Sequence, residues 1–265
     1  MTPLGSLWIG PLGRLHEVRD AATEFDRSIG LGVEEFAALS GGITTTRLAA
    51  PPRRLALSWS AMAPSEAQWI EALARNVFGP GPLAVIDPAS RNLLEGGQSQ
   101  GYGPRSAYTM AGWGSLVERA DRVMTITNPR DSDQLHFEHS HWFGWPVAAG
   151  LPVHMATGLP EARCHLSFWA ADQSFVSEAG PAPNLTAVPP AGAVFVLPRL
   201  ILRAWSGAKA VGPAVLRMGD PVTADEIGTL GDGCPAMTVT AYTDKARPPH
   251  RDLTLNLVEV RRTPR

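Results

Sequence analysis

The segment HFEHSHWFGWP, residues 136–146, concentrates the side chains of this sequence that could bind a metal or a sugar. Histidine and glutamate are common metal ligands, and tryptophan rings stack on the apolar faces of sugars. Alternate side chains of a strand point to opposite faces, so His136 and Glu138 would face one side and His139 and His141 the other. A metal site on such a strand would need ligands from elsewhere.

Ligands of that kind are scarce in the rest of the sequence. After His141 the next carboxylate is Glu161, and the chain has no HExxH pattern. Cys164 and Cys234 are too far apart for a zinc cluster or a disulfide framework, and we expect two partly buried thiols. We therefore predict neither a metal nor a cofactor. A metal-dependent jelly-roll enzyme is kept as an alternative on residues 136–142 alone.

The acidic residues do not suggest catalysis either. The pairs Glu34-Glu35 and Asp225-Glu226 are adjacent in sequence, whereas a glycosidase needs two carboxylates that face each other across ~5–9 Å. No Walker A phosphate-binding pattern is present. We predict that the protein is not an enzyme and name no catalytic residue.

Composition bounds the class of protein. With 265 residues, 44% hydrophobic and 18% charged, the chain should fold into one large or two ordinary globular domains. A formal net charge of -2 without Lys/Arg runs argues against nucleic acid as a partner. The N-terminal residues lack the pattern of a signal peptide, and no apolar run is long enough for a membrane span.

Periodicity predicts a mostly β protein. The chain has 26 glycines and 24 prolines spread along its length, which indicates frequent turns. Residues 53–60 alternate in the manner of a half-buried strand, and residues 64–78 have the spacing of one amphipathic helix. Further strands are predicted within 82–88, 121–129, 136–142, 152–158, 163–170, 193–205, 214–220, 237–242 and 253–260.

The order of these elements predicts two domains. Residues 1–96 would form a β-domain with the single helix, and the polar, glycine-rich residues 97–106 a linker. Residues 107–265 would form an antiparallel β-sandwich, which we expect to be a jelly roll, because strands without intervening helices cannot build a parallel sheet.

Several motifs of the first domain occur in a familiar order: the strand RRLALSWS, a helix with Trp69 and Leu73, and then GPGPLAVIDPASRNLL at 79–94. This order resembles the N-terminal domain of the distal tail proteins and related minor tail proteins of long-tailed phages, those of actinobacterial hosts in particular. The matching positions are Trp59, Trp69, Leu73, Gly79 to Leu83, Asp87, Pro88, and Asn92 to Leu94. The amino-acid composition, poor in lysine and rich in Ala, Arg, Pro and Gly, also suggests a host with a high-GC genome.

The later part of the chain is similar to the jelly-roll domain, like a carbohydrate-binding module, that follows in many such proteins. The similar segments are Trp145 to Val147 with Gly150, Ala162 to Phe168, Pro189 to Ala193, Val196 to Pro198, and Gly212 to Leu216. Together the two sets of motifs cover most of residues 50–260, whereas residues 1–50 match only loosely.

The resemblance implies a structural role in the virion. Such a protein would be made in the cytoplasm of the bacterial host and would form a ring, expected to be hexameric, at the distal end of the tail tube. Its partners would be itself, the tail tube and the hub or baseplate, with an outward sandwich domain that contacts other tail proteins or host glycans. Candidate residues for the contact between subunits are the large apolar groups Trp8, Ile9 and Leu12, although they could equally pack on their own domain.

A soluble, lectin-like glycan-binding protein is the main alternative. Sugar sites on β-sandwiches combine an aromatic platform with polar groups for the hydroxyls. The candidate platforms are Trp142, Trp169 and Trp205, and the candidate polar partners are His139, His141, Asp172 and Gln173. Trp145 is expected to be buried. The sequence leaves three interpretations of residues 136–146 open: a half-buried strand and turn, part of a glycan surface, or a metal site.

Overall fold

The computed structural model describes residues 6–29, 33–38, 41–47, 52–128 and 130–260. The chain forms two compact units, each discontinuous in sequence. The sandwich unit comprises the described parts of residues 1–17 and 84–234, and the helix unit those of residues 18–83 and 235–265. Antiparallel strands dominate both units, so the predicted mostly β fold is confirmed.

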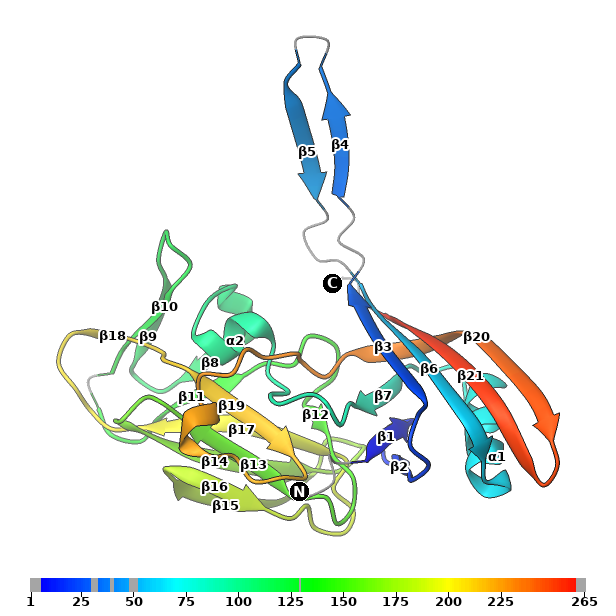
Figure 1. Ribbon diagram of the computed structural model, residues 1–265. Helices are drawn as coiled ribbons and strands as arrows, with labels where there is room; N and C mark the ends of the chain where they lie inside the picture. The colour runs from blue at the N-terminus through cyan, green and yellow to red at the C-terminus, as the bar shows by residue number, and fades with distance from the viewer. Residues whose placement is uncertain (1–5, 30–32, 39–40, 48–51, 129, 261–265) are drawn as a thin grey trace. The chain divides into compact units, whose positions relative to one another are not determined.

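The helix unit contains four neighbouring antiparallel strands (Figure 1). In sheet order they are β20 (Ala236–Arg247), β21 (His250–Glu259), β6 (Arg53–Met62) and β3 (Glu24–Ile29). Along β6, Leu55, Leu57 and Trp59 alternate with more exposed residues and are buried, as their spacing predicts. Strands β20 and β3, at the two ends of this group, therefore come from segments near opposite ends of the sequence.

Helix α1 (Pro64–Ala74) packs on β20 and β21. Proline is tolerated at its first position because the amide there has no partner within the helix. Ile70 and Leu73 bury the apolar face. The helix predicted over 64–78 is present but ends at Ala74, and the chain then turns toward Gly79, whose φ of 104° suits glycine.

A second hairpin of the helix unit pairs only with itself among the described residues. Its strands are β4 (Val33–Ala37) and β5 (Ile43–Arg47), in the register Val33↔Arg47 and Ala37↔Ile43. Figure 1 draws it as a separate two-stranded ribbon. We call β4 and β5 the isolated hairpin.

The sandwich unit is built from several antiparallel sheets around one core. Its largest sheet contains β15 (Phe175–Ala182), β14 (Ala162–Trp169), β17 (Phe195–Leu202), β11 (Asp133–Phe137), β8 (Tyr108–Ala111) and β12 (Trp145–Pro146). Two smaller sheets contain β16 (Asn184–Ala187), β13 (Val153–Thr157) and β19 (Ala214–Met218), and β18 (Ala208–Ala210), β10 (Met124–Thr127) and β9 (Ser115–Glu118). Strand β1 (Leu7–Gly10) pairs with β7 (Leu83–Ile86), and β2 (His16–Val18) follows β1.

The core of the sandwich unit lies between the large sheet and the smaller ones. Leu135, Leu166 and Leu200 of the large sheet are fully buried in the same apolar cluster as Met155 and Leu216 of the smaller sheets. On β14 and β17 the intervening residues point away from this cluster, which leaves the large sheet with an outer face.

The predicted division at residues 97–106 does not coincide with the two units. Residues 236–259 belong with β6 of the helix unit, where Leu255 pairs with Leu57. Residues 96–100 form a short helix, α2 (Gly96–Gln100), in which Gln98 and Ser99 are buried. Local composition identifies neither the long-range strand pairing nor this burial, because glycine-rich polar sequence also occurs at tightly packed turns.

Two local predictions also need correction. The strand predicted over 136–142 ends at Phe137, and residues 138–144 form a loop before β12. The glycines and proline of GDGCP, 231–235, predict a tight hairpin turn, but the segment has no secondary structure before β20 begins at Ala236.

Candidate functional site

The loop of residues 138–144 is organised around the imidazole of His139. Its Nδ1 accepts hydrogen bonds from the amides of His141 (3.0 Å) and Trp142 (3.1 Å), so the proton lies on Nε2, which donates to the carbonyl oxygen of Cys234 at 3.0 Å. The ring centroid also lies 5.1 Å from those of Trp142 and Trp145. His139 therefore holds the loop in shape, with both nitrogens engaged.

The remainder of the loop reaches the outer face of the large sheet. A Cβ on Gly144 would come within 2.8 Å of the Leu197 side chain and the Val196 carbonyl oxygen, so the close approach to β17 requires glycine. Phe143, next to it, packs its ring 5.3 Å from that of Trp169 and 6.0 Å from that of Phe195.

These rings belong to a group that we call the aromatic row: Phe143, Trp169, Phe175 and Phe195. Trp169 pairs with Phe195 on one side and with Phe175 on the other, which places three of the rings in line across the sheet. The Trp169 and Phe175 rings are 5.6 Å apart, and Phe175 is 55% exposed. The aromatic row thus presents an accessible apolar edge beside the half-buried indole of Trp169.

A second group on the outer face, the polar row, contains Gln134, His136, His165, Glu178 and Arg199. His136 of β11 and His165 of β14 both pair with Arg199 of β17, so the three side chains lie in one line across the strands. The Arg199 guanidinium donates to His165 Nδ1 (3.2 Å), Gln134 Oε1 (3.1 Å) and Glu178 Oε2 (2.9 Å). This planar cation orders its neighbours in the way that arginine favours.

The environment of the polar row keeps its histidines uncharged. Burial lowers the pKa of His136, and the Arg199 charge lowers it further. The pKa of His165 is lowered by the same two causes, with burial again the larger. Near neutral pH the full charges of the polar row are therefore those of Arg199 and Glu178, which are opposite.

The residues predicted to bind glycan do not form one site. Trp142 and His141 lie side by side in the loop, with ring centroids 5.3 Å apart. Asp172 and Gln173 lie in the exposed turn after Trp169. The carboxylate of Asp172 accepts hydrogen bonds from the amide (3.0 Å) and the hydroxyl (2.7 Å) of Ser174. The bond from the hydroxyl is the largest cause that lowers the pKa of Asp172. These residues flank the aromatic row.

Trp205 is separate from the other predicted tryptophans. Trp169 pairs with Phe195 at the start of β17, whereas Trp205 follows the end of that strand. About 23 Å of strand therefore separates Trp169 from Trp205. The ring is half-buried against the core, with Lys209 Nζ 5.6 Å from its centroid. The exposed tryptophan that the sequence did not single out is Trp113, at 70% exposure, with the Arg130 guanidinium carbon 4.1 Å from its ring centre.

Two of the three residues predicted to contact another subunit pack within the sandwich unit. Ile9 is fully buried on β1, and Trp8 packs against the core cluster. Leu12 is half-buried in the turn after β1. Large apolar groups with real exposure occur elsewhere, on the isolated hairpin: Val33 is 43%, Phe36 54% and Ile43 68% exposed.

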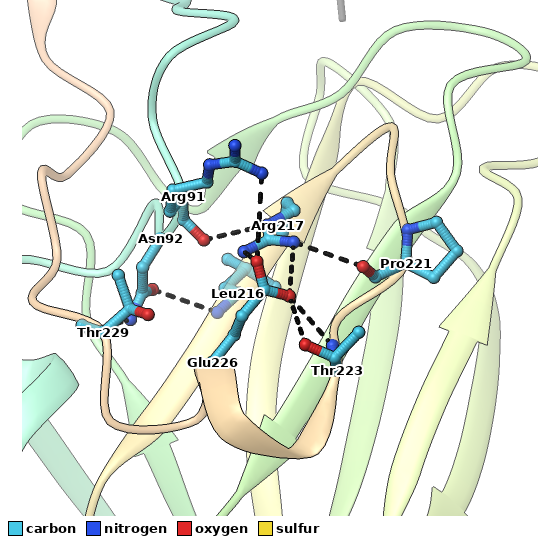
Figure 2. Close-up of polar contacts among 8 residues, drawn as sticks. All are labelled: Arg91, Asn92, Leu216, Arg217, Pro221, Thr223, Glu226 and Thr229. Atoms are coloured by element: carbon cyan, nitrogen blue, oxygen red, sulfur yellow. Dashed lines mark hydrogen bonds and ion pairs between the residues drawn. The ribbon is translucent and has the colours of Figure 1, made fainter. Parts of the chain in front are cut away.

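Arg217, which is buried, forms an ion pair with Glu226 in the sandwich unit (Figure 2). Arg217, whose side chain is 5% exposed, donates two hydrogen bonds of 2.9 Å to the carboxylate of Glu226. The amide and hydroxyl of Thr223 bond to the same carboxylate at 2.9 Å. The bond from Arg217 is the main reason that the pKa of Glu226 falls to about 2. These contacts fix the chain after β19.

Asn92, one of the positions that match the phage tail proteins, hydrogen-bonds to the backbone of the same region. Its amide nitrogen donates to the carbonyl oxygens of Ala214 (2.9 Å) and Thr229 (3.1 Å), and its Oδ1 accepts from the amides of Leu94 and Leu216 at 3.1 Å each. The pocket beside Arg217, lined in part by Trp8 and Asp220, measures about 40 Å³, which is room for a few water molecules. We assign this region a structural role.

One catalytic pattern in the sequence is a coincidence of spacing. Residues 97–101, GQSQG, match the GxSxG pattern of the nucleophile elbow of hydrolases. An elbow serine is exposed on a strand-to-helix turn, whereas Ser99 lies inside α2 and is fully buried. Its hydroxyl donates to the Gly96 carbonyl oxygen (2.9 Å) and accepts from the Gly231 amide (2.8 Å), so it stabilises packing.

Both cysteines are thiols, as predicted, but they are fully buried and not partly buried. Neither forms a disulfide, and burial raises the pKa of Cys164 to about 12, which makes its thiol unreactive at neutral pH. Among the described residues, no group of three or more His, Cys, Asp or Glu side chains could hold a metal ion. No helix within the described ranges is long and apolar enough to cross a membrane.

No family model and no curated protein matches the chain. Among solved structures, it is similar to the accessory secretory protein 1, 2 and 3 structure from Streptococcus pneumoniae, with 10% identity, a TM-score of 0.35, and coverage of 46% of this chain and 96% of that chain. It is also similar to the enzymatically active domain of tailspike protein 4 from bacteriophage CBA120, with 12% identity, a TM-score of 0.32, and coverage of 48% of this chain and 21% of that chain. TM-scores of this size do not indicate a shared fold.

Proposed function

We propose that the protein is a structural subunit of a phage tail tip that associates with copies of itself into a closed, six-membered ring. In this proposal the helix unit makes the contacts between subunits, and the sandwich unit binds host glycans or other tail proteins. The tail tube and the hub or baseplate are its other partners in the virion. The observation that carries the proposal is the isolated hairpin.

A two-stranded hairpin by itself is at best marginally stable in water. Both edges of the isolated hairpin leave backbone N–H and C=O groups without a neighbouring strand in the described residues, and such edges are templates for pairing with another chain. Val33, Ala37 and Ile43 share one face, and Phe36 lies on the other. A second copy of the chain would bury these groups and supply the missing strand neighbours.

The positions that carry the family resemblance support the same proposal. Trp59 and Leu73 are buried in the helix unit, and Asn92 is buried in the sandwich unit with its amide group fully bonded. These residues therefore determine how the chain folds. A resemblance at fold-determining positions is what shared architecture produces, whereas shared catalysis would preserve reactive groups.

The mass of the full-length protein in solution, measured by light scattering over a concentration series with negative-stain microscopy of the same sample, tests this proposal. We expect a closed oligomer of fixed mass and a ring in projection, because a rotational contact that closes gives a defined number of subunits. A protein that stays monomeric at every concentration, or that grows without limit, would contradict it.

The second candidate is a soluble glycan-binding protein without a ring. The aromatic row favours it, because Phe175 is 55% exposed beside Trp169 and the polar row lies on the same sheet face. A monomer that binds saccharide would favour this candidate over the first. The metal-dependent enzyme has no support in the described residues, since no ligand cluster is found there.

A further inference from the structure

The outer face of the large sheet places the aromatic row and the polar row on the same strands. Trp169 and His165 lie on one face of β14, and Phe195 and Arg199 on the same face of β17. The members of each pair are four positions apart, which is about 13 Å along a strand. Glu178 pairs with Ser167, midway between His165 and Trp169, so it is the member of the polar row nearest the aromatic row.

The polar row has hydrogen-bonding capacity beyond its internal contacts. Gln134 uses Oε1 to accept from Arg199, and the described residues show no partner for its amide nitrogen. Glu178 accepts through Oε2, and its side chain is 52% exposed. The Gln134 amide, the half-buried His136 imidazole and the Glu178 carboxylate on one sheet face match sugar hydroxyls, each of which both donates and accepts.

The charges of the polar row indicate the class of sugar. Arg199 and Glu178 are joined by a 2.9 Å ion pair, so the site has no excess positive charge to attract an acidic saccharide. An anionic group at Arg199 would have to displace Glu178 or be repelled by it. A neutral saccharide can bond to both side chains without breaking their contact.

We propose that the aromatic row and the polar row form one binding site for a neutral oligosaccharide of at least two sugar units. One pyranose ring stacks on Phe175 and the exposed edge of Trp169, and the next unit bonds through its hydroxyls to Glu178, Arg199 and His136. The ~13 Å from Trp169 to His165 sets the minimum length, because one sugar ring stacked on Phe175 could reach Glu178 but not Arg199 or His136. The inference rests on the glycan-binding part of the proposed function and does not depend on the ring.

The site differs from the one predicted from sequence. Of the seven residues predicted to bind glycan it keeps only Trp169, and the strand register brings the others of the site to it. Trp113 is a useful control because it is more exposed than any member of the aromatic row and comes from the segment between β8 and β9. Binding that depended on Trp113 or Trp142 alone would place the saccharide elsewhere.

Saturation-transfer NMR and isothermal titration with the full-length protein test the proposal. The probes are the neutral trisaccharides maltotriose, cellotriose, tri-N-acetylchitotriose and β-1,4-galactotriose, with trigalacturonate as the acidic arm. We expect at least one neutral trisaccharide to bind at millimolar concentration and trigalacturonate to bind more weakly. Absence of binding by all four neutral probes, or a preference for trigalacturonate, would overturn the proposal.

Variants then locate the bound sugar. Phe175→Ala and Glu178→Ala change exposed side chains and should leave folding intact, yet each should weaken binding about tenfold through lost stacking or hydroxyl bonds. Trp113→Ala should bind as the parent does. Unchanged affinity in both Phe175→Ala and Glu178→Ala would overturn the site.

The oligomeric mass of each sample separates this inference from the rest of the proposed function. A ring that binds none of the neutral probes defeats the saccharide site and leaves self-association standing. A monomer that binds sugar through Phe175 and Glu178 defeats the ring and leaves the site standing.

Discussion

Two hairpins of the helix unit differ in what stabilises them. The β20–β21 hairpin pairs with β6, carries α1 on one face, and buries Leu253, Leu255 and Leu257. The isolated hairpin pairs with no third strand in the described residues and has its large apolar side chains exposed. Since both are antiparallel two-stranded pairs, we attribute the difference to their neighbours. We infer that one hairpin is stabilised within the subunit and the other between subunits.

The two hairpins also differ in their ion pairs. Arg251 of β21 forms ion pairs with Asp244 of β20 and, at 2.9 Å, with Glu71 of α1. This network ties the β20–β21 hairpin to the helix that covers it. Glu34 and Glu35 of the isolated hairpin are exposed and lie opposite threonines, which cannot neutralise them.

The largest effect should come from the core of the β20–β21 hairpin. Leu255 is fully buried and pairs with Leu57, so Leu255→Ala removes packed methyl groups and leaves a cavity. We expect a loss of about 2–5 kcal/mol in the free energy of unfolding, measured by urea denaturation followed by tryptophan fluorescence. A loss below about 1 kcal/mol would show that this hairpin is not held by its core.

An intermediate effect is expected from the ion-pair network. Arg251→Met keeps the aliphatic packing of the side chain but leaves the carboxylates of Asp244 and Glu71 without their cation. Because the Arg251 side chain is 27% exposed, water partly compensates, and we expect a loss of about 1–2 kcal/mol in the same urea assay. A larger cost than that of Leu255→Ala would reverse the proposed order of core and charge.

Alkaline pH should weaken the same hairpin. Burial, and then the Asp244 charge, raises the pKa of Tyr242 from 10.0 to about 12 in the folded protein. The folded state therefore holds this proton more tightly than the unfolded state, so the contribution is complete below pH 10 and is lost as pH rises through about 12. Tyr242→Phe should flatten this part of the stability profile measured by denaturation. An unchanged profile would mean that Tyr242 does not report on the hairpin.

The smallest effect on subunit stability is expected in the isolated hairpin. Ile43 is 68% exposed, so Ile43→Ala removes little buried surface from the monomer. At concentrations where the protein is dissociated, we expect a change within about 0.5 kcal/mol in the free energy of unfolding. A cost of 2 kcal/mol or more, on the order of a core substitution, would show that the side chain already has a partner within its own subunit.

Elements with strong periodicity could be predicted from the sequence, and partners distant along the chain could not. The alternation of Leu55, Leu57 and Trp59 identified β6, and helical spacing identified α1. The assignment of β20 and β21 to the same unit as β6 depends on register across almost 200 residues, Leu255 with Leu57, which no local pattern contains.

The candidate site shows the same limit. Trp169 could be singled out by its residue type, but its neighbour Phe175 is identified only by the pairing of β14 with β15. His136 attracted attention as a metal ligand, whereas its place beside Arg199 follows from the β11–β17 register. The expectation that His139 lies on a strand was wrong because its ring bonds to the amides of its own loop, which bend the chain away from β11.

The most direct test of the central claim compares the oligomeric mass of the wild type with that of the double variant Phe36→Ser, Ile43→Thr by light scattering at matched concentrations. Val77→Thr is the control, because Val77 is 65% exposed in the same unit but outside the isolated hairpin. We predict a closed oligomer for the wild type and the control, and a folded monomer for the double variant, with an unfolding midpoint below that of the wild type because the stabilisation by subunit association is lost. A double variant that keeps the wild-type mass would contradict the claim that the isolated hairpin joins the subunits.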